Sequence, residues 1–264
     1  MNLEVISFLA TAPGAGGAAA LAVTGDSNVV KNSRVGAKSW IVAATFKTQV
    51  SGFGQLTFPS GHDVTRGLRF RHTAGIVDDR LGYNQRAQVQ PQEAISVTLA
   101  GSAVGGQTEF ACLHMLYEEQ PGIAARFISP SDLQVRGVSL LTVEDSLTPV
   151  SSTTYSGARA INAASDLLRA NTDYAILGAN LGVVCAVLGI KGPDTGNSRV
   201  GIPGSTSNVP DTGDWFRILS DQYGLGLIPV FNSANRGNTL IDVLQDQAAA
   251  VVPFSLNLVQ LAPA

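Results

Sequence analysis

Charged residues are scarce in this chain of 264 residues, of which only 14% are Asp, Glu, Lys or Arg. A typical soluble domain carries roughly 25% charged residues. The 17 basic and 20 acidic residues leave a formal net charge of −3, and Lys and Arg form no cluster in the sequence. The chain therefore lacks the basic patch typical of proteins that bind nucleic acid directly. The composition favours a large, sheet-rich fold whose surface is partly covered by neighbouring molecules.

Cysteine is nearly absent, since Cys112 and Cys185 are the only two. Two cysteines cannot build a disulfide framework or a zinc site. Each lies in an apolar run, "EFACLHML" for the first and "GVVCAVLG" for the second. Because a free thiol packs like a small hydrophobic group, we expect both side chains to be buried and unpaired.

Long apolar runs are also missing. None approaches the ~18 residues that indicate a transmembrane helix, so we expect no such helix. The first basic residue is Lys31. The N-terminus thus lacks the positively charged region of a signal peptide, and we expect no leader.

The sequence motifs of common enzymes do not occur either. There is no G-x-S-x-G elbow, no phosphate loop of the G-x-x-x-x-G-K type, no H-E-x-x-H and no C-x-x-C. These motifs position nucleophiles, phosphates, zinc and redox thiols. We therefore expect no catalytic residue, no cofactor-binding residue and no metal ligand, and we predict that the protein is not an enzyme.

A glycine-rich stretch near the N-terminus leaves one chemical alternative open. Gly14, Gly16 and Ala19 have the spacing of a dinucleotide-binding fingerprint, in which glycines let backbone amides approach a pyrophosphate. The fingerprint needs a following helix, a strand and then an acidic residue. Loop-forming residues follow instead, so a flexible Gly/Ala loop or arm is favoured.

Histidine offers a second alternative. His62 and Asp63 are adjacent in a turn sequence, and such a pair can serve as a general base or bind a metal. No third partner can be identified, because His72 and His114 are the only other histidines. A polar loop is favoured for the pair. His114 stands in an apolar strand, where we expect a core or interface residue.

A repeated P-D-T-G element offers a third chemical alternative, a cation site. Asp194 lies in the first copy, and Asp211 and Asp214 lie in and just after the second. Their oxygens suit a hard cation such as Ca²⁺, but the set pattern of a calcium loop is lacking. Two type I turns are favoured, and whether these residues bind a cation stays open.

Short apolar runs bounded by Gly, Pro, Asn or Asp dominate the first half of the chain, and they indicate β-strands. In "GLRFRHT", Leu68 and Phe70 alternate with arginines, which is the period of a half-buried strand. Roughly eight such runs in the first ~120 residues indicate a sandwich or a barrel.

Helix signals are few. Residues 162–171 favour a short helix, and residues 211–226 favour another, with Asp214 as N-cap and Gly224 as the stop. A short helical turn is expected from Ser131. Neither longer helix is flanked by the strand–helix–strand pattern of an α/β protein.

The two halves of the chain resemble one another. Trp40 and Tyr174 begin similar double-strand segments 134 positions apart, and Phe110 and Phe254 open the final strands 144 positions apart. We interpret this as an internal duplication in which the same closing hairpin occurs at the end of each half. We expect Trp40, Phe110 and Phe254 to be strongly buried.

These patterns predict an all-β fold of two tandem jelly-roll-like β-sandwiches with one or two short helices. The first sandwich is assigned to residues 1–120 and the second to residues 161–264. Residues 121–160, which contain three prolines and a Ser/Thr cluster, are assigned to the crossing between the two domains, and this crossing is expected to carry one or two strands and a short helical turn.

As an architecture, the whole chain resembles the smaller double jelly-roll major capsid proteins of tailless bacterial viruses (bacteriophages). The resemblance implies a structural virion protein, a capsid subunit that self-assembles into pseudo-hexameric trimers and tiles an icosahedral shell. It implies sandwiches that stand upright on the shell, and an N-terminal segment that reaches neighbours or the interior. The implied partners are further copies of the chain and other virion proteins, and the implied location is the virion after synthesis in the host cytoplasm.

Two other classes of function remain. An accessory virion spike or cement protein, or a lectin-like binding protein, would need an exposed aromatic or polar site, and the sequence shows no such cluster. An enzyme would have to act through Gly14 and Gly16 or through His62 and Asp63.

Overall fold

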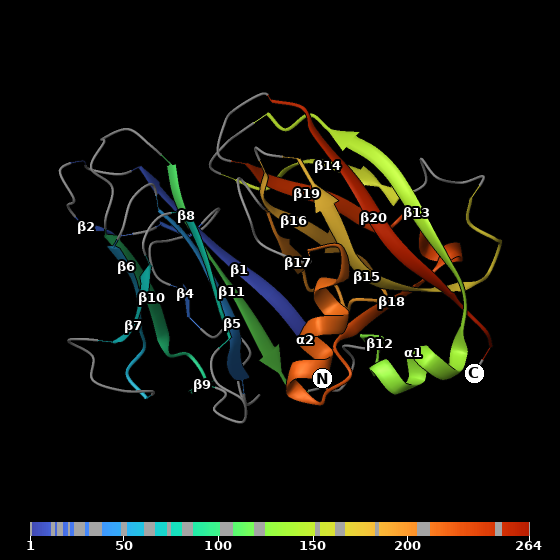
Figure 1. The fold of residues 1–264 in the computed structure, drawn as a ribbon, viewed down its shortest axis with the longest axis horizontal. Coiled ribbons are helices and arrows are strands. Elements are labelled where there is room, and N and C mark those ends of the chain that lie inside the picture. Colours follow the sequence, from blue (N-terminus) through green and yellow to red (C-terminus); the bar gives the residue numbers. More distant parts are fainter. Residues whose placement is uncertain are drawn as a thin grey trace. The chain divides into compact units, whose positions relative to one another are not determined.

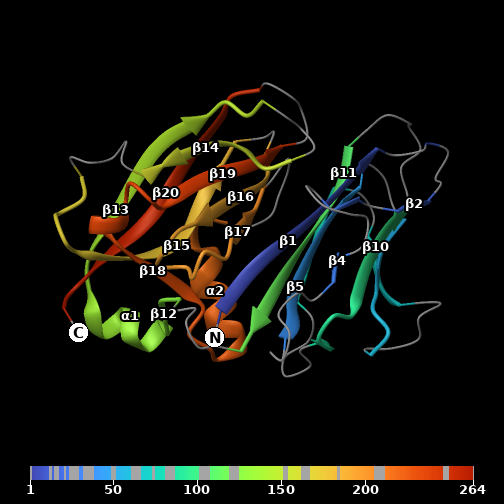
Figure 2. The same cartoon turned by 180° about the vertical axis from the view of Figure 1, so that it is seen from behind.

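The chain folds into two compact units. The computed structural model describes residues 2–11, 14, 18–20, 22–23, 30–31, 39–48, 52–60, 67–72, 75–80, 87–100, 108–118, 125–150, 154–161, 167–182, 185–204, 212–245 and 250–263. The N-terminal unit comprises Val5–Glu118 and Ser207–Val209, and the C-terminal unit comprises Met1–Glu4, Glu119–Thr206 and Pro210–Ala264. Figures 1 and 2 show their strands from opposite sides.

Two sheets build the N-terminal unit. One has the order β3-β1-β11-β5-β8 with β9 also paired to β5, and the other has the order β2-β10-β6-β7 with β4 also paired to β10. The strands are β1 (Asn2–Thr11), β2 (Ala18–Ala20), β3 (Ala22–Val23), β4 (Val30–Lys31), β5 (Ser39–Thr48), β6 (Gly52–Thr57), β7 (Leu68–His72), β8 (Gly75–Arg80), β9 (Ala87–Val89), β10 (Ala94–Ala100) and β11 (Thr108–Tyr117).

The core of the N-terminal unit lies between these two sheets. Phe8, Phe46 and Leu113 from the first sheet meet Leu56 and Val97 from the second in one buried cluster. Alternate residues of β10 are buried, as expected for a strand with one face toward a core.

The C-terminal unit also has two sheets, with the orders β12-β18-β15-β20-β13 and β14-β19-β16-β17. Its elements are β12 (Phe127–Ile128), α1 (Pro130–Arg136), β13 (Gly137–Leu147), β14 (Ser156–Ala160), β15 (Asp173–Leu181), β16 (Cys185–Lys191), β17 (Val200–Pro203), the 3₁₀ turn η2 (Thr212–Asp214), α2 (Trp215–Tyr223), β18 (Ile228–Asn232), the 3₁₀ turn η3 (Ser233–Asn235), β19 (Leu240–Gln245) and β20 (Val252–Leu261).

The two units share one strand order. In each unit the last strand lies between two strands from the first half of that unit: β11 lies between β1 and β5, and β20 lies between β13 and β15, in the orders β1-β11-β5-β8 and β13-β20-β15-β18. The second sheets correspond in the same way, as β2-β10-β6-β7 and β14-β19-β16-β17. This is the strand order of an eight-stranded jelly roll. The predicted fold class, two tandem jelly-roll-like sandwiches with short helices, is confirmed.

The two predicted closing hairpins differ from the structure. The segments compared in the two halves do fall on corresponding strands, β10 with β19 and β11 with β20. However, β10 and β11 belong to different sheets, and so do β19 and β20. The expectation of a paired hairpin was wrong, because the connection crosses from one layer of the sandwich to the other.

Both helices have clear ends. Ser129 caps α1 through a capping box with Asp132, and Pro130 occupies the first turn, so the helix begins one residue before Ser131. Gly224 ends α2 in the left-handed conformation at φ 62°. Asp214 takes the N-cap position of α2 but makes no capping hydrogen bond. No described helix is long and apolar enough to cross a membrane.

Other local predictions were wrong. Residues 167–171 form turns rather than the expected helix, with Asn171 at φ 46°, and residues 162–166 lie outside the described part. The described residues of the expected crossing, 121–160, form α1, β12, β13 and β14, which belong to the C-terminal unit. Of the three prolines in this stretch, Pro130 begins helix α1 and Pro149 follows β13, and Pro121 lies outside the described residues.

The burial predictions were partly right. Phe110 and Phe254 are buried, and Cys112 and Cys185 are buried free thiols. Trp40 is only half-buried. Its neighbour Ile41 belongs to the core cluster, and successive side chains of a strand point to opposite faces, so Trp40 points away from that core.

Replacing Phe254 by Ala should lower the free energy of unfolding by about 3–5 kcal/mol, because it leaves a cavity beside Leu256 and Leu258 of the same buried face. Urea denaturation followed by fluorescence measures the change. Val251→Ala, at an exposed position three residues away, is the control and should change stability by less than ~0.5 kcal/mol. Equal effects of the two substitutions would contradict this placement of β20.

Gly178 lies in β15 directly beneath η2, and an added Cβ would stand 2.1 Å from the carbonyl oxygen of Thr212. Gly178→Ala should therefore displace η2 and cost roughly 1–3 kcal/mol. Gly237→Ala is the matched control, because no atom lies within 4 Å of its added Cβ. A Gly178→Ala protein with the thermal midpoint of the control would show that η2 does not pack here.

Candidate functional site

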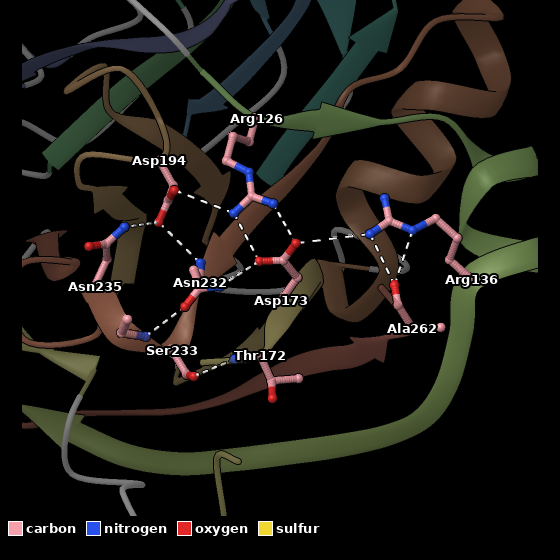
Figure 3. Close-up of polar contacts among 10 residues, drawn as sticks. Arg126, Arg136, Thr172, Asp173, Asp194, Asn232, Ser233, Asn235 and Ala262 are labelled. Atoms are coloured by element: carbon pink, nitrogen blue, oxygen red, sulfur yellow. Dashed lines mark hydrogen bonds and ion pairs between the residues drawn. The ribbon is translucent and has the colours of Figure 1, made fainter. Parts of the chain in front are cut away.

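The densest polar cluster in the described residues lies in the C-terminal unit (Figure 3). Arg126 makes two hydrogen bonds to the carboxylate of Asp173, one of them 2.9 Å between Nη1 and Oδ1. The same guanidinium lies 3.5 Å from Oδ1 of Asp194. Asn232 joins both carboxylates, since its Nδ2 donates to Asp173 at 2.8 Å and its backbone N–H donates to Asp194 at 3.1 Å.

Backbone pairing positions these side chains. Arg126 donates its N–H to the carbonyl of Asp194 and accepts the N–H of Val230, so it is held between a loop and β18. Next to it, Ser233 accepts the N–H of Thr172 and donates its hydroxyl to the carbonyl of Arg169. The cluster therefore joins segments that are far apart in the sequence, at the start of β15 and the end of β18.

The charges in this cluster stabilise one another. The hydrogen bond from Arg126 lowers the pKa of Asp173, helped by Asn232 and by the charges of Arg126 and Arg136, and it outweighs the opposing effect of burial. The same hydrogen bond raises the pKa of Arg126. Arg136 lies 3.9 Å from Asp173 and donates to the carbonyl oxygen of Ala262 near the C-terminus.

The aspartates considered as cation ligands have other roles where the structure describes them. Asp194 is paired with Arg126 and accepts a further hydrogen bond from Asn235 at 2.8 Å, so its oxygens bind donors of the fold. Asp214 pairs with Arg217, which also bonds Asp221 at 2.8 Å. Asp211 lies outside the described residues. Within the described ranges, no three His, Cys, Asp or Glu side chains come together as a metal site.

The structure describes some of the remaining candidate residues, those of the glycine-rich stretch and the histidines. Gly14 has φ 88°, and Ala19 lies in strand β2 rather than in the helix that a dinucleotide fingerprint requires. His114 is buried in β11, as expected, and His72 ends β7. Gly16, His62 and Asp63 lie outside the described residues. Among the described candidates, Gly14, Ala19, His72 and His114 lie on different elements or turns and form no common site.

One apolar surface stands out in the C-terminal unit. Val135 of α1 and Val138 and Leu140 of β13 expose 84%, 58% and 67% of their surface. Scattered apolar residues on a protein surface are ordinary, but a group of neighbours suits contact with another macromolecule. We call Val135, Val138 and Leu140 the β13 surface.

The sequence analysis missed both features. Asp194 had been singled out in its P-D-T-G element, but its pairing with Arg126 and Asn232 could not be predicted, because the members of the cluster are separated by up to about a hundred residues. The β13 surface had a signal, since apolar residues stand at both even positions (138 and 140) and odd positions (141 and 143), which departs from the alternation of a strand with one buried face.

Comparison with known proteins gives little support for a family. No family model matches the chain, and no curated protein matches its sequence. The chain is similar in structure to the PBSX exported protein XepA, at 8% identity over 97% of this chain and 86% of that one, with a TM-score of 0.27.

Two further solved structures match with similarly low identity and TM-scores. The major capsid protein P2 of bacteriophage PM2 is 9% identical over 99% of this chain and 98% of that one, with a TM-score of 0.27. A chain of the Sulfolobus turreted icosahedral virus is 8% identical over 97% and 91%, with a TM-score of 0.22. Scores this low establish neither a common fold nor a common function, so the strand order described above carries the assignment of the fold.

Asp173→Asn should destabilise the protein by about 1–2 kcal/mol at pH 7, because Arg126 loses the nearer of its two carboxylate partners at a partly exposed site. The pKa of Asp173 is lowered on folding, so its contribution is complete above the ordinary pKa of about 4 and is lost as the pH falls through the lowered folded value. The stability difference between wild type and Asp173→Asn should thus shrink below about pH 4.

Urea denaturation at a series of pH values measures this difference. Asp221→Asn removes the same charge at an exposed position and serves as the control, with a smaller effect at pH 7. A difference for Asp173→Asn that stays constant from pH 7 to pH 2 would show that the ion pair with Arg126 does not stabilise the fold.

Proposed function

We propose that this chain is a structural virion protein, a capsid subunit that assembles as a trimer and tiles a closed shell. One observation carries the proposal: a single chain contains two jelly-roll units with the same strand order. A subunit that only needed one binding site would have no use for this repetition. A subunit that has to meet many copies of itself gains from it.

Symmetry gives the physical reason. Three copies of a chain with two similar units present six similar lobes around one axis, and such a particle fits a hexagonal position in a lattice. Each contact between particles can then be weak, because many contacts formed together multiply their effect.

The surface composition supports the same function. Low charge reduces the repulsion between copies that a strongly charged surface would cause. Edge strands and exposed apolar side chains, such as those of the β13 surface, are liabilities for an isolated protein, and they are tolerated where a neighbour covers them.

The proposal assigns no catalytic step to the protein. The two described aspartates considered for cation chemistry are held by arginines. The proposed location is the virion, after synthesis in the host cytoplasm, and the proposed partners are other copies of this chain and other virion proteins.

The purified protein should form a trimer of about 82 kDa, three times the 27.4 kDa of one chain. Native mass spectrometry and light scattering after gel filtration measure this mass. Larger assemblies should appear as the concentration rises. A protein that stays monomeric at every concentration would contradict the proposal, and a monomer that binds glycans would favour the lectin-like or accessory virion protein.

A further inference from the structure

The strand β13 forms the outer edge of its sheet. It pairs with β20, from Gly137 opposite Leu261 to Leu147 opposite Val252, and no other described strand pairs with it. Both views of the C-terminal unit show β20 on one side of β13 (Figures 1 and 2). An edge strand offers unpaired backbone N–H and C=O groups, which are a template for pairing with another strand.

The first part of β13 is open to solvent on both faces. Each residue from 137 to 140 is exposed, whereas Val143 and Leu147 further along are buried. Residues 137–143 carry no charge, and the next residue, Glu144, is the first acidic one. Natural proteins protect edge strands with charged side chains and prolines, and this stretch contains neither.

The other unit shows how this position can be filled. Strand β1 takes the same place in the strand order as β13, beside the last strand of its unit. On its outer edge β1 carries β3 in antiparallel pairing, with Phe8 opposite Val23 and Leu9 opposite Ala22. This position of the jelly roll therefore accepts one more antiparallel strand of apolar residues.

We propose that β13 pairs antiparallel with β13 of a second copy of this chain, across a twofold axis next to Leu140. The choice of a second copy rests on the proposed function, because a shell subunit meets other copies of itself. Pairing of identical strands is isologous, so the same surface serves both partners. It adds a contact between trimers, beyond the trimer itself.

The sequence of β13 suits this register. With Leu140 opposite Leu140, the exposed Leu140 side chains of the two copies meet, and Thr142 lies on the same exposed face of each strand. The bulge between Gly137 and Ser139 lies outside the central residues 139–141, which pair regularly with β20.

The contact is small by the standards of stable complexes. A specific interface buries about 800 Å² on each partner and involves about 20–30 residues a side. The β13 surface and its strand supply far fewer, so this pairing alone would be weak. It suits a contact that forms many times in a lattice.

Oxidative crosslinking of the full-length protein tests the register. In Leu140→Cys, the two new thiols face one another with Cα atoms about 4.5–5.5 Å apart, within the range of a disulfide. In the control Thr142→Cys, the two thiols are four residues apart along the strands, or roughly 13 Å. The native Cys112 and Cys185 are buried and leave the background low.

Leu140→Cys should give a band at twice the chain mass on a non-reducing gel, and Thr142→Cys should give several-fold less. Equal crosslinking of the two variants would overturn the register, and absence of crosslinking in both would overturn the pairing. Trimers without a crosslink at position 140 would reject this inference and leave the proposed function standing. Crosslinked pairs without trimers would reject the proposed trimer and leave the β13 pairing standing.

A second variant covers the case in which cysteine perturbs the strand. Leu140→Lys places like charges opposite one another and should weaken association between trimers at least tenfold in sedimentation velocity, with the trimer and the circular dichroism spectrum unchanged. Val150→Lys, at a residue that is 85% exposed but beyond the end of β13, is the matched control and should associate like wild type. Unchanged association of Leu140→Lys would contradict the proposal.

Discussion

The fold depends on the place of the last strand in each unit. The strand β20 lies between β13 and β15, and its buried residues Phe254, Leu256 and Leu258 face the core. In the same way β11 lies next to β5, with Leu113 and Met115 in the core cluster. Because the last strand pairs with two strands from the first half of its unit, each unit closes only when its entire segment is in place. This non-local pairing defines the jelly roll.

The repetition of this arrangement connects structure with function. Two units with one strand order place similar surfaces on a single chain, which is what assembly into six-lobed particles requires. The units differ at the edge strand that the proposed β13 pairing uses. The outer edge of β1 is paired with β3, whereas the described outer edge of β13 is not paired. In the proposed assembly, similar cores would let the units of one chain pack around one axis, and the different edges would connect that chain to the next particle.

Much of the fold could be predicted from the sequence, because alternation and turn residues mark strands locally. The strands around Trp40 and Tyr174 are corresponding strands of the two units, as the comparison of the halves indicated. The burial of Trp40 could not be predicted from its size. Whether a strand residue points toward the core depends on which face of the strand packs against the second sheet, and that face holds Ile41. The helix expected at 162–171 was wrong in its described part, where side-chain hydrogen bonds, such as that from the N–H of Arg169 to the hydroxyl of Tyr174, hold a turn. The Arg126, Asp173 and Asp194 cluster depends on pairings between distant segments, which no local pattern encodes.

The most direct test of the account is an electron microscopy reconstruction of the purified protein at assembling concentration. The account predicts a threefold particle with six similar lobes, each a sandwich of two sheets. A particle with a single lobe per chain, or one with helices layered against a parallel sheet, would contradict it.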